Sequence, residues 1–250
     1  MGFDWFLFFY PALQAFINGQ SPYSLTDFVT PPWMLPVLAP LAFMPPLGGA
    51  LLVDVLAFTG LAALCRKHQM FWAVLPLALC YPMLMLLWNA QLEGFVLWGL
   101  VVGPTPLGFF LLMSKPQVAG LVGLIWMLEA WQTGSWRRVL WLAGPTTGLA
   151  VLFVGLYPEW LGVIGQAAQR TYTANGFPYS VALGVASLVF AVRHKREEWA
   201  ALATLLLVPY ANVQSWMAAL TLLTARYRVE GTSAALASWI LAFYLEPTRW

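Results

Sequence analysis

The chain has 250 residues, of which 61% are hydrophobic and only 9% are charged. Soluble domains average about 25% charged residues, so a chain this depleted is expected to face lipid. The formal net charge of +2 gives no indication of nucleic-acid binding. Cys65 and Cys80 stand apart, in or beside apolar runs and without a CxxC pattern. Neither a disulfide framework nor a zinc site is therefore expected, and we expect no metal and no cofactor.

Apolar runs follow one another along the chain. The first segment, residues 1–32, is apolar but broken by one acid, one glycine and several prolines. A membrane span needs roughly 20 apolar residues. We predict spans at 47–65, 71–88, 92–104, 139–156, 179–193, 198–210, 213–226 and 232–246.

The apolar segment 107–130 is interrupted by Ser114-Lys115-Pro116-Gln117, and each half is short for a full crossing. A hairpin of short helices or a broken helix is expected there. The sequence thus predicts an all-α transmembrane bundle of about 8–10 segments, formed by residues 33–250 of a single domain that spans 1–250. Gly144-x-x-x-Gly148 indicates close helix packing within that bundle.

The basic clusters indicate an orientation. If the segment 107–130 crosses to the outer side of the membrane and comes back, all the basic clusters fall on the other side. They are Arg66 to His68, Arg137 and Arg138, Arg193 to Arg196, and Arg226 and Arg228. The positive-inside rule makes that side cytoplasmic, in a bacterial-type inner membrane. The outer side then receives residues 1–32, the turn at 89–93, the bend at 115, the loop 157–178 and the C-terminus.

Asp4 is the first candidate for chemistry. It stands among aromatic residues, from Phe3 to Tyr10. A carboxylate in such a setting is partly desolvated and therefore a stronger base, as a general base near neutral pH requires. A helix cap or a solvated terminal residue is the alternative.

Lys115 is the second candidate, because a lysine inside an apolar segment is costly unless it faces water, protein or an anion. A phosphate is a natural partner for such a cation, and a lysine that snorkels to the interface is the alternative. Arg170, in the outer loop, is a candidate second contact for an anion, or else a solvated arginine. Glu93 lies in the outer turn, while Asp54 lies in the middle of a span and Glu129 near the inner end of its segment.

Several short motifs occur in order: Asp4 with Tyr10-Pro11-Ala12, Gly19-x-x-Pro22-Tyr23, Pro31-Pro32, Leu38-Ala39-Pro40-Leu41-Ala42, Met44-Pro45 and Lys115-Pro116-Gln117. Together with Trp136-Arg137-Arg138 and a looser match at 208–211, they cover roughly residues 4–220. This series resembles the polytopic GT-C-fold glycosyltransferases, in the branch similar to polyprenyl-phosphate-mannose-dependent mannosyltransferases.

The resemblance implies a mechanism. Such enzymes move a sugar from a polyprenyl-phosphate donor to an acceptor on the outer face of the membrane, with the acid of the first outer loop as general base. Asp4 would take that role, and Lys115 or Arg170 would neutralise the phosphate leaving group. We group Gln117, Tyr10, Tyr23 and Glu93 with them as candidate contacts to the donor.

The chain departs from the family pattern in three ways. It is short for the family, it lacks the tyrosine usually placed before Pro31-Pro32, and it lacks the span that normally precedes the acid, by truncation or by loss. A non-catalytic GT-C-like subunit of a larger membrane complex is therefore the main alternative. A small transporter that uses Asp54, Glu93 and Lys115 as intramembrane charges is a third hypothesis.

Overall fold

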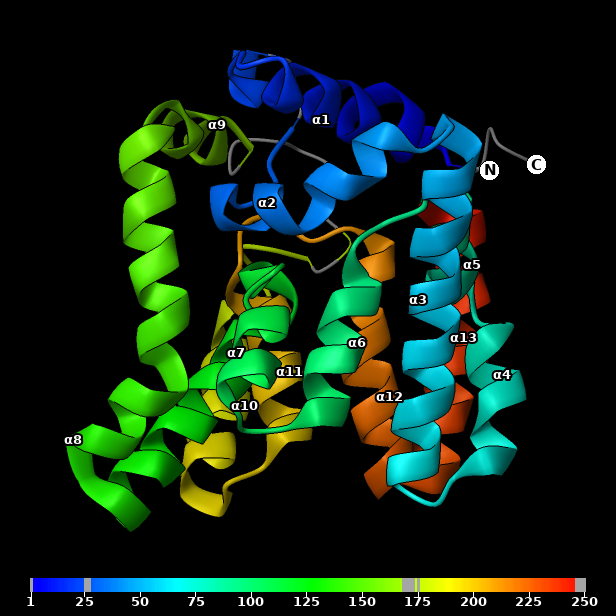
Figure 1. The fold of residues 1–250 in the computed structure, drawn as a ribbon. Helices are drawn as coiled ribbons and strands as arrows, with labels where there is room; N and C mark the ends of the chain where they lie inside the picture. The colour runs from blue at the N-terminus through cyan, green and yellow to red at the C-terminus, as the bar shows by residue number, and fades with distance from the viewer. Residues whose placement is uncertain (1, 25–27, 168–173, 175, 246–250) are drawn as a thin grey trace.

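The computed structural model describes residues 2–24, 28–167, 174 and 176–245. Over these ranges all regular structure is helical, as the composition predicts. The helices form an upright bundle with a layer of short helices lying across one end (Figure 1).

The layer across the top of the bundle in Figure 1 is built mostly from the N-terminal segment. Its short helices are interrupted by prolines and Gly19, which prevent one long helix from forming. They are η1 (Trp5–Phe9), α1 (Tyr10–Ile17), η2 (Pro22–Ser24), η3 (Pro32–Met34), α2 (Leu35–Leu38), η4 (Ala39–Phe43) and, from later in the chain, α9 (Glu159–Ala167). We call this layer the cap.

The bundle helices follow the predicted apolar runs closely. Helix α3 (Pro46–Lys67) corresponds to 47–65, and the run 71–88 becomes η5 (Phe71–Ala73), α4 (Val74–Ala78) and α5 (Tyr81–Asn89). The next elements are α6 (Glu93–Val102), α7 (Pro106–Leu112) and α8 (Pro116–Leu156). The last five are α10 (Val181–His194), α11 (Glu197–Leu207), η6 (Val213–Trp216), α12 (Met217–Arg226) and α13 (Arg228–Leu245).

Few of these helices are long enough to cross a membrane alone. Among the described residues, only α3 and α8 are long and apolar enough. A third crossing is formed if η5–α4 and α5, which meet at an angle of 66°, are two halves of one broken span. Helix α6 has 10 residues and rises only about 15 Å, half of a hydrocarbon core of about 30 Å. Its lower end is held by α3, because the Lys67 ammonium donates to the Leu100 carbonyl at 2.7 Å.

The predicted break inside 107–130 is confirmed. Helix α7 ends at Leu112, and α8 begins at Pro116. Between them, the backbone of Lys115 is not helical (φ −140°, ψ 79°). Helix α8 itself turns back at Gly134 and Ser135, where Ser135 has φ 60°. We call residues 116–133 the descending arm and 136–156 the return arm; Figure 1 shows the two arms meeting at the bottom.

The interpretation of Gly144-x-x-x-Gly148 as a packing motif inside the bundle is wrong. A Cβ atom on either glycine would meet no heavy atom within 4 Å. Both lie on the return arm, which stands apart from the other helices along most of its length in Figure 1.

The basic clusters gather at one end of the bundle. Helix α3 ends with Arg66 and Lys67, α10 with Arg193 and His194, and α12 with Arg226. These helix ends and the turn of α8 all lie at the bottom of Figure 1, opposite the cap. We call this the basic end.

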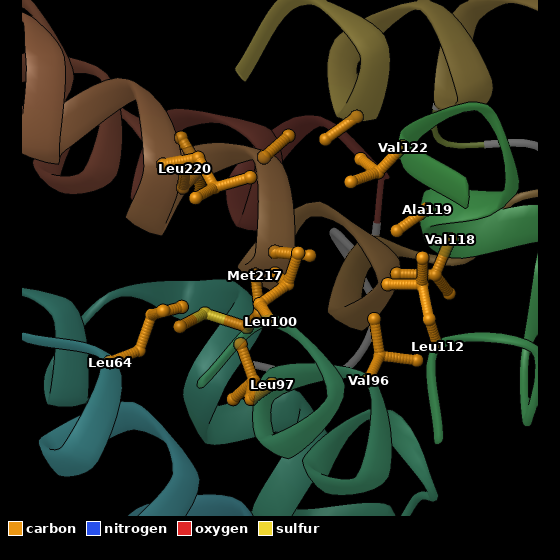
Figure 2. Close-up of a cluster of buried hydrophobic side chains, with 14 of the residues drawn as sticks. Leu64, Val96, Leu97, Leu100, Leu112, Val118, Ala119, Val122, Met217 and Leu220 are labelled. Atoms are coloured by element: carbon orange, nitrogen blue, oxygen red, sulfur yellow. The ribbon is translucent and has the colours of Figure 1, made fainter. Parts of the chain in front are cut away.

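The bundle core is a cluster of aliphatic side chains from α3, α6, α7, α8 and α12 (Figure 2). Leu64, Leu97 and Met217 are completely buried within it. Helices α3 and α6 come closest at Gly94, where a Cβ atom would lie 2.7 Å from the Cα and N atoms of Ala57. Only glycine permits this backbone approach.

Replacing Gly94 with alanine is expected to lower the free energy of unfolding by about 1–3 kcal/mol, because α3 and α6 must separate. The matched control is Gly144→Ala, where the added methyl group enters open space. This variant replaces a glycine inside a helix, so it is not expected to lower the stability. Thermal unfolding in detergent, followed by circular dichroism, measures both variants. Equal midpoints for the two would contradict the close approach at Gly94.

Candidate functional site

A chain of polar contacts lies between the cap and the bundle. The Lys115 ammonium donates to the side-chain oxygen of Gln91 at 2.5 Å and to Oε1 of Glu93 at 2.9 Å. The Gln91 amide donates in turn to the carboxylate of Asp4. Gln91 thus bridges the two residues that the sequence singled out for chemistry.

Local breaks in the helices bring these side chains together. Helix α5 ends at Asn89, and its C-cap Ala90, with φ 48°, reverses the chain, so that Gln91 lies just before α6 and Glu93 is the first residue of α6. Lys115 occupies the N-cap position of α8, where Pro116 is compatible with the first helical turn. Asp4 immediately precedes η1 and makes no capping hydrogen bond with its side chain. The cap interpretation of Asp4 therefore has no support in the geometry.

The Lys115–Glu93 pair is deeply buried. The side chain of Lys115 is 9% exposed and that of Glu93 only 1%. Oε1 of Glu93 also lies 3.5 Å from the Ser215 hydroxyl, whereas Oε2 is buried with no hydrogen-bond partner among the described residues. A buried charge without a partner is costly, and the Lys115 ammonium is the partner of the Glu93 carboxylate.

Asp4, Gln91 and Lys115 line one cavity of about 170 Å³ under the cap. Its wall is partly polar and partly aromatic. The other lining residues are Phe8, Phe9, Phe28, Val29, Thr30, Pro31, Gln117, Tyr210, Asn212 and Ser215. The cavity therefore offers a carboxylate, an ammonium and several hydrogen-bonding groups to one small polar molecule.

An apolar pocket of about 330 Å³ adjoins this cavity. The two share four lining residues, namely Val29, Pro31, Gln117 and Tyr210. The remaining lining is mostly apolar and comes from Pro116, from α9 and from the segment that follows α11: Trp160, Ile164, Ala167, Val208 and Pro209. A polar cavity continuous with an apolar one can accommodate the two ends of an amphiphilic molecule.

The remaining predicted site residues lie in different places. Gln117 lines both cavities, and Glu93 lies behind Lys115 as its counter-ion. Tyr10 and Tyr23 do not line the polar cavity; the Tyr10 hydroxyl donates to Met44 O at 3.3 Å, within the cap. Arg170 lies outside the described residues.

Tyr23 holds the cap together. Its hydroxyl donates to the Thr30 carbonyl at 2.7 Å, and both residues are buried. Burial raises the pKa of Tyr23 far above its usual range, with smaller contributions from Tyr157 and Glu159. The hydroxyl therefore remains protonated, and a donor, at physiological pH.

Replacing Tyr23 with phenylalanine is expected to lower the free energy of unfolding by about 1–3 kcal/mol, because the Thr30 carbonyl is left buried without this donor. Tyr179, which is 94% exposed, is the matched control, and Tyr179→Phe is expected to change stability little. Thermal unfolding monitored by near-ultraviolet circular dichroism measures both variants. A loss as large in Tyr179→Phe would contradict the assignment.

Five polar lining residues were not among the predicted site residues: Thr30, Gln91, Tyr210, Asn212 and Ser215. Gln91 lies within the predicted outer turn at 89–93, and its bridging contact depends on where Asp4 and Lys115 meet. Asn212 lies in the turn between the predicted spans 198–210 and 213–226, and Ser215 lies at the start of the second span, on the same side as Asp4. That placement of polar residues at a proline-marked turn is the signal that could have identified them.

The other ionisable candidates lie elsewhere. Asp54 is in the middle of α3, and its Oδ1 is buried without a hydrogen-bond partner in the described part of the chain. Glu129 lies on the descending arm, near the basic end. Cys65 and Cys80 are buried free thiols. The described residues contain no group of three or more histidine, cysteine, aspartate or glutamate side chains that could hold a metal ion.

Comparisons of the chain with models of protein families, with curated proteins and with solved structures find no match in any of the three.

Proposed function

We propose that the chain is an integral membrane glycosyltransferase that moves a sugar from a polyprenyl-phosphate donor to an acceptor hydroxyl. The observation that carries this proposal is the meeting of Asp4 and Lys115 in one cavity, with Gln91 between them. A carboxylate and a cation in the same small cavity are the two charges that the transfer of a sugar from a phosphate requires.

In the proposed reaction Asp4 accepts the proton of the acceptor hydroxyl. The hydroxyl oxygen forms a bond to the anomeric carbon of the donor sugar as the bond from that carbon to the phosphate oxygen breaks. The polyprenyl phosphate leaves with the electron pair of that bond. Lys115 stabilises the charge that develops on the phosphate, and its position at the N-terminus of α8 adds the positive end of a helix dipole.

The adjoining apolar pocket supports a lipid-linked donor. Its lining from α9 and from residues 208–210 is suited to an isoprenoid chain, and the shared residues would lie near the phosphate. On this proposal the cavity faces the outer side of a cytoplasmic membrane, because residues of the cap line it and the cap lies opposite the basic end in Figure 1.

The arrangement that supports the enzyme also supports a second candidate, a non-catalytic GT-C-like subunit of a membrane complex. Glu93 already neutralises Lys115, and Gln91 already satisfies both Lys115 and Asp4. These contacts can stabilise the junction of cap and bundle without any substrate.

Binding of the phosphate distinguishes the two candidates. We expect polyprenyl phosphate to raise the unfolding temperature of the purified protein, since a ligand of the folded state stabilises it by mass action. Uncharged polyprenol of the same chain length is the control ligand and is expected to give a much smaller shift. Equal shifts for the two lipids, or none for either, would favour the non-catalytic subunit.

A further inference from the structure

A second cavity, of about 300 Å³, opens at the basic end of the bundle. It lies between the descending and return arms of α8, beside the turn that joins α10 to α11. It shares no lining residue with the cavity under the cap. The proposed sugar transfer makes no use of it.

Two cations from separate elements line this cavity. Arg138 begins the return arm, and Lys195 is the C-cap of α10, with φ 52°. The Arg138 guanidinium donates to the Thr133 hydroxyl at 3.2 Å across the turn of α8, which orients it. Glu129 is the one acidic residue in the described lining, so the cavity has an excess of one positive charge.

The walls of the cavity are suited to the boundary between lipid and water. Trp126 and Trp141 line it; Trp126 is buried and donates to Glu197 at 2.6 Å, whereas Trp141 is 57% exposed. Tryptophan rings favour the headgroup level of a membrane. Above the cavity the return arm presents an exposed apolar face formed by Leu149, Leu152 and Leu156, which have the i, i+3, i+7 spacing of one helix side.

We propose that this cavity binds the headgroup of an anionic phospholipid. Arg138 and Lys195 contact the phosphate, and the acyl chains lie along the apolar face of the return arm. Basic pockets between membrane helices recognise anionic headgroups in this way. The excess positive charge of the lining favours a headgroup of net negative charge over a zwitterionic one, whose phosphate is offset by its own cation. The bound lipid covers a helix that otherwise stands apart from the bundle.

The exposed apolar face distinguishes a lipid from a soluble phosphate. A free phosphate would contact only Arg138 and Lys195, whereas a phospholipid also covers the exposed apolar side chains of the return arm. The proposal is independent of the sugar transfer, because no residue is common to the two cavities.

The test is the affinity of the purified full-length protein for phosphatidylglycerol and for phosphatidylcholine. The protein is solubilised in a neutral maltoside detergent, so that no charged bilayer surface attracts the basic end. Native mass spectrometry then counts the lipid molecules that remain bound to it. The test variant is the double substitution Arg138→Gln and Lys195→Gln. The control, Arg137→Gln and Arg193→Gln, removes the same charge from neighbouring exposed positions that do not line the cavity.

We expect the test variant to bind phosphatidylglycerol about tenfold more weakly, with a much smaller change for phosphatidylcholine and an unchanged circular dichroism spectrum as the check on folding. The control is expected to bind phosphatidylglycerol like the wild type. Equal losses in both variants would assign the effect to the general charge of the basic end and overturn the proposal, as would an unchanged test variant. Displacement of the lipid by glycerol phosphate at similar concentrations would indicate a site for soluble phosphates and would overturn it too.

Discussion

Sugar transfer from a polyprenyl-phosphate donor is expected to fall by about 10²-fold or more when Asp4 is replaced by asparagine, because the amide cannot accept the proton of the acceptor. Asparagine retains an oxygen that can accept the hydrogen bond from Gln91, so the contact under the cap is preserved. Binding of polyprenyl phosphate is expected to persist. Transfer is measured as labelled mannose moved from polyprenyl-phosphate mannose to acceptors in membranes that contain each variant.

Asp54→Asn is the matched control, since it makes the same chemical change in the middle of α3 and away from the cavity. It is expected to leave transfer unchanged. Full activity in Asp4→Asn would remove Asp4 as the general base. Flux of a solute that is lost in Asp54→Asn would instead support the transporter hypothesis.

Replacing Lys115 with methionine is expected to lower the free energy of unfolding by about 3–5 kcal/mol, because Glu93 is left as a buried charge without its counter-ion. Glu93 is 1% exposed, so water cannot take the place of the ammonium. Unfolding in a denaturing detergent, followed by circular dichroism, measures the loss.

A double-mutant cycle separates this charge effect from simple loss of packing. Adding Glu93→Gln to Lys115→Met removes the unpaired charge and is expected to recover most of the lost stability. A double variant that is less stable than Lys115→Met alone would contradict the assignment of Glu93 as the counter-ion.

Much of the fold was predictable because apolar runs in a lipid-facing chain have few alternatives to helix. Helix α3 and the helix break at Lys115 follow directly from the pattern of apolar residues and proline. The shortness of α6 was also visible, since the predicted run 92–104 is itself too brief for a full crossing. The isolation of Gly144 and Gly148 was hidden, because the GxxxG spacing carries no information about which partner, if any, lies opposite.

The candidate site was predictable only as a set of separate residues. The cost of an unpaired lysine pointed to a partner for Lys115, and the sequence placed Glu93 and Asp4 on the same side. The choice between them depends on tertiary geometry: Glu93 pairs directly, and Asp4 connects through Gln91. The motif Gly19-x-x-Pro22-Tyr23 led us to predict that Tyr23 contacts the donor. Its hydroxyl instead donates to the Thr30 carbonyl, a contact that depends on the fold of the cap.

The most direct test of the central proposal is whether the wild-type protein releases polyprenyl phosphate from polyprenyl-phosphate mannose in membranes supplied with acceptor. We predict release in step with the appearance of mannosylated product, dependent on Asp4 and on Lys115. A well-folded protein that gives no release and no product would contradict the account and leave the non-catalytic subunit in its place.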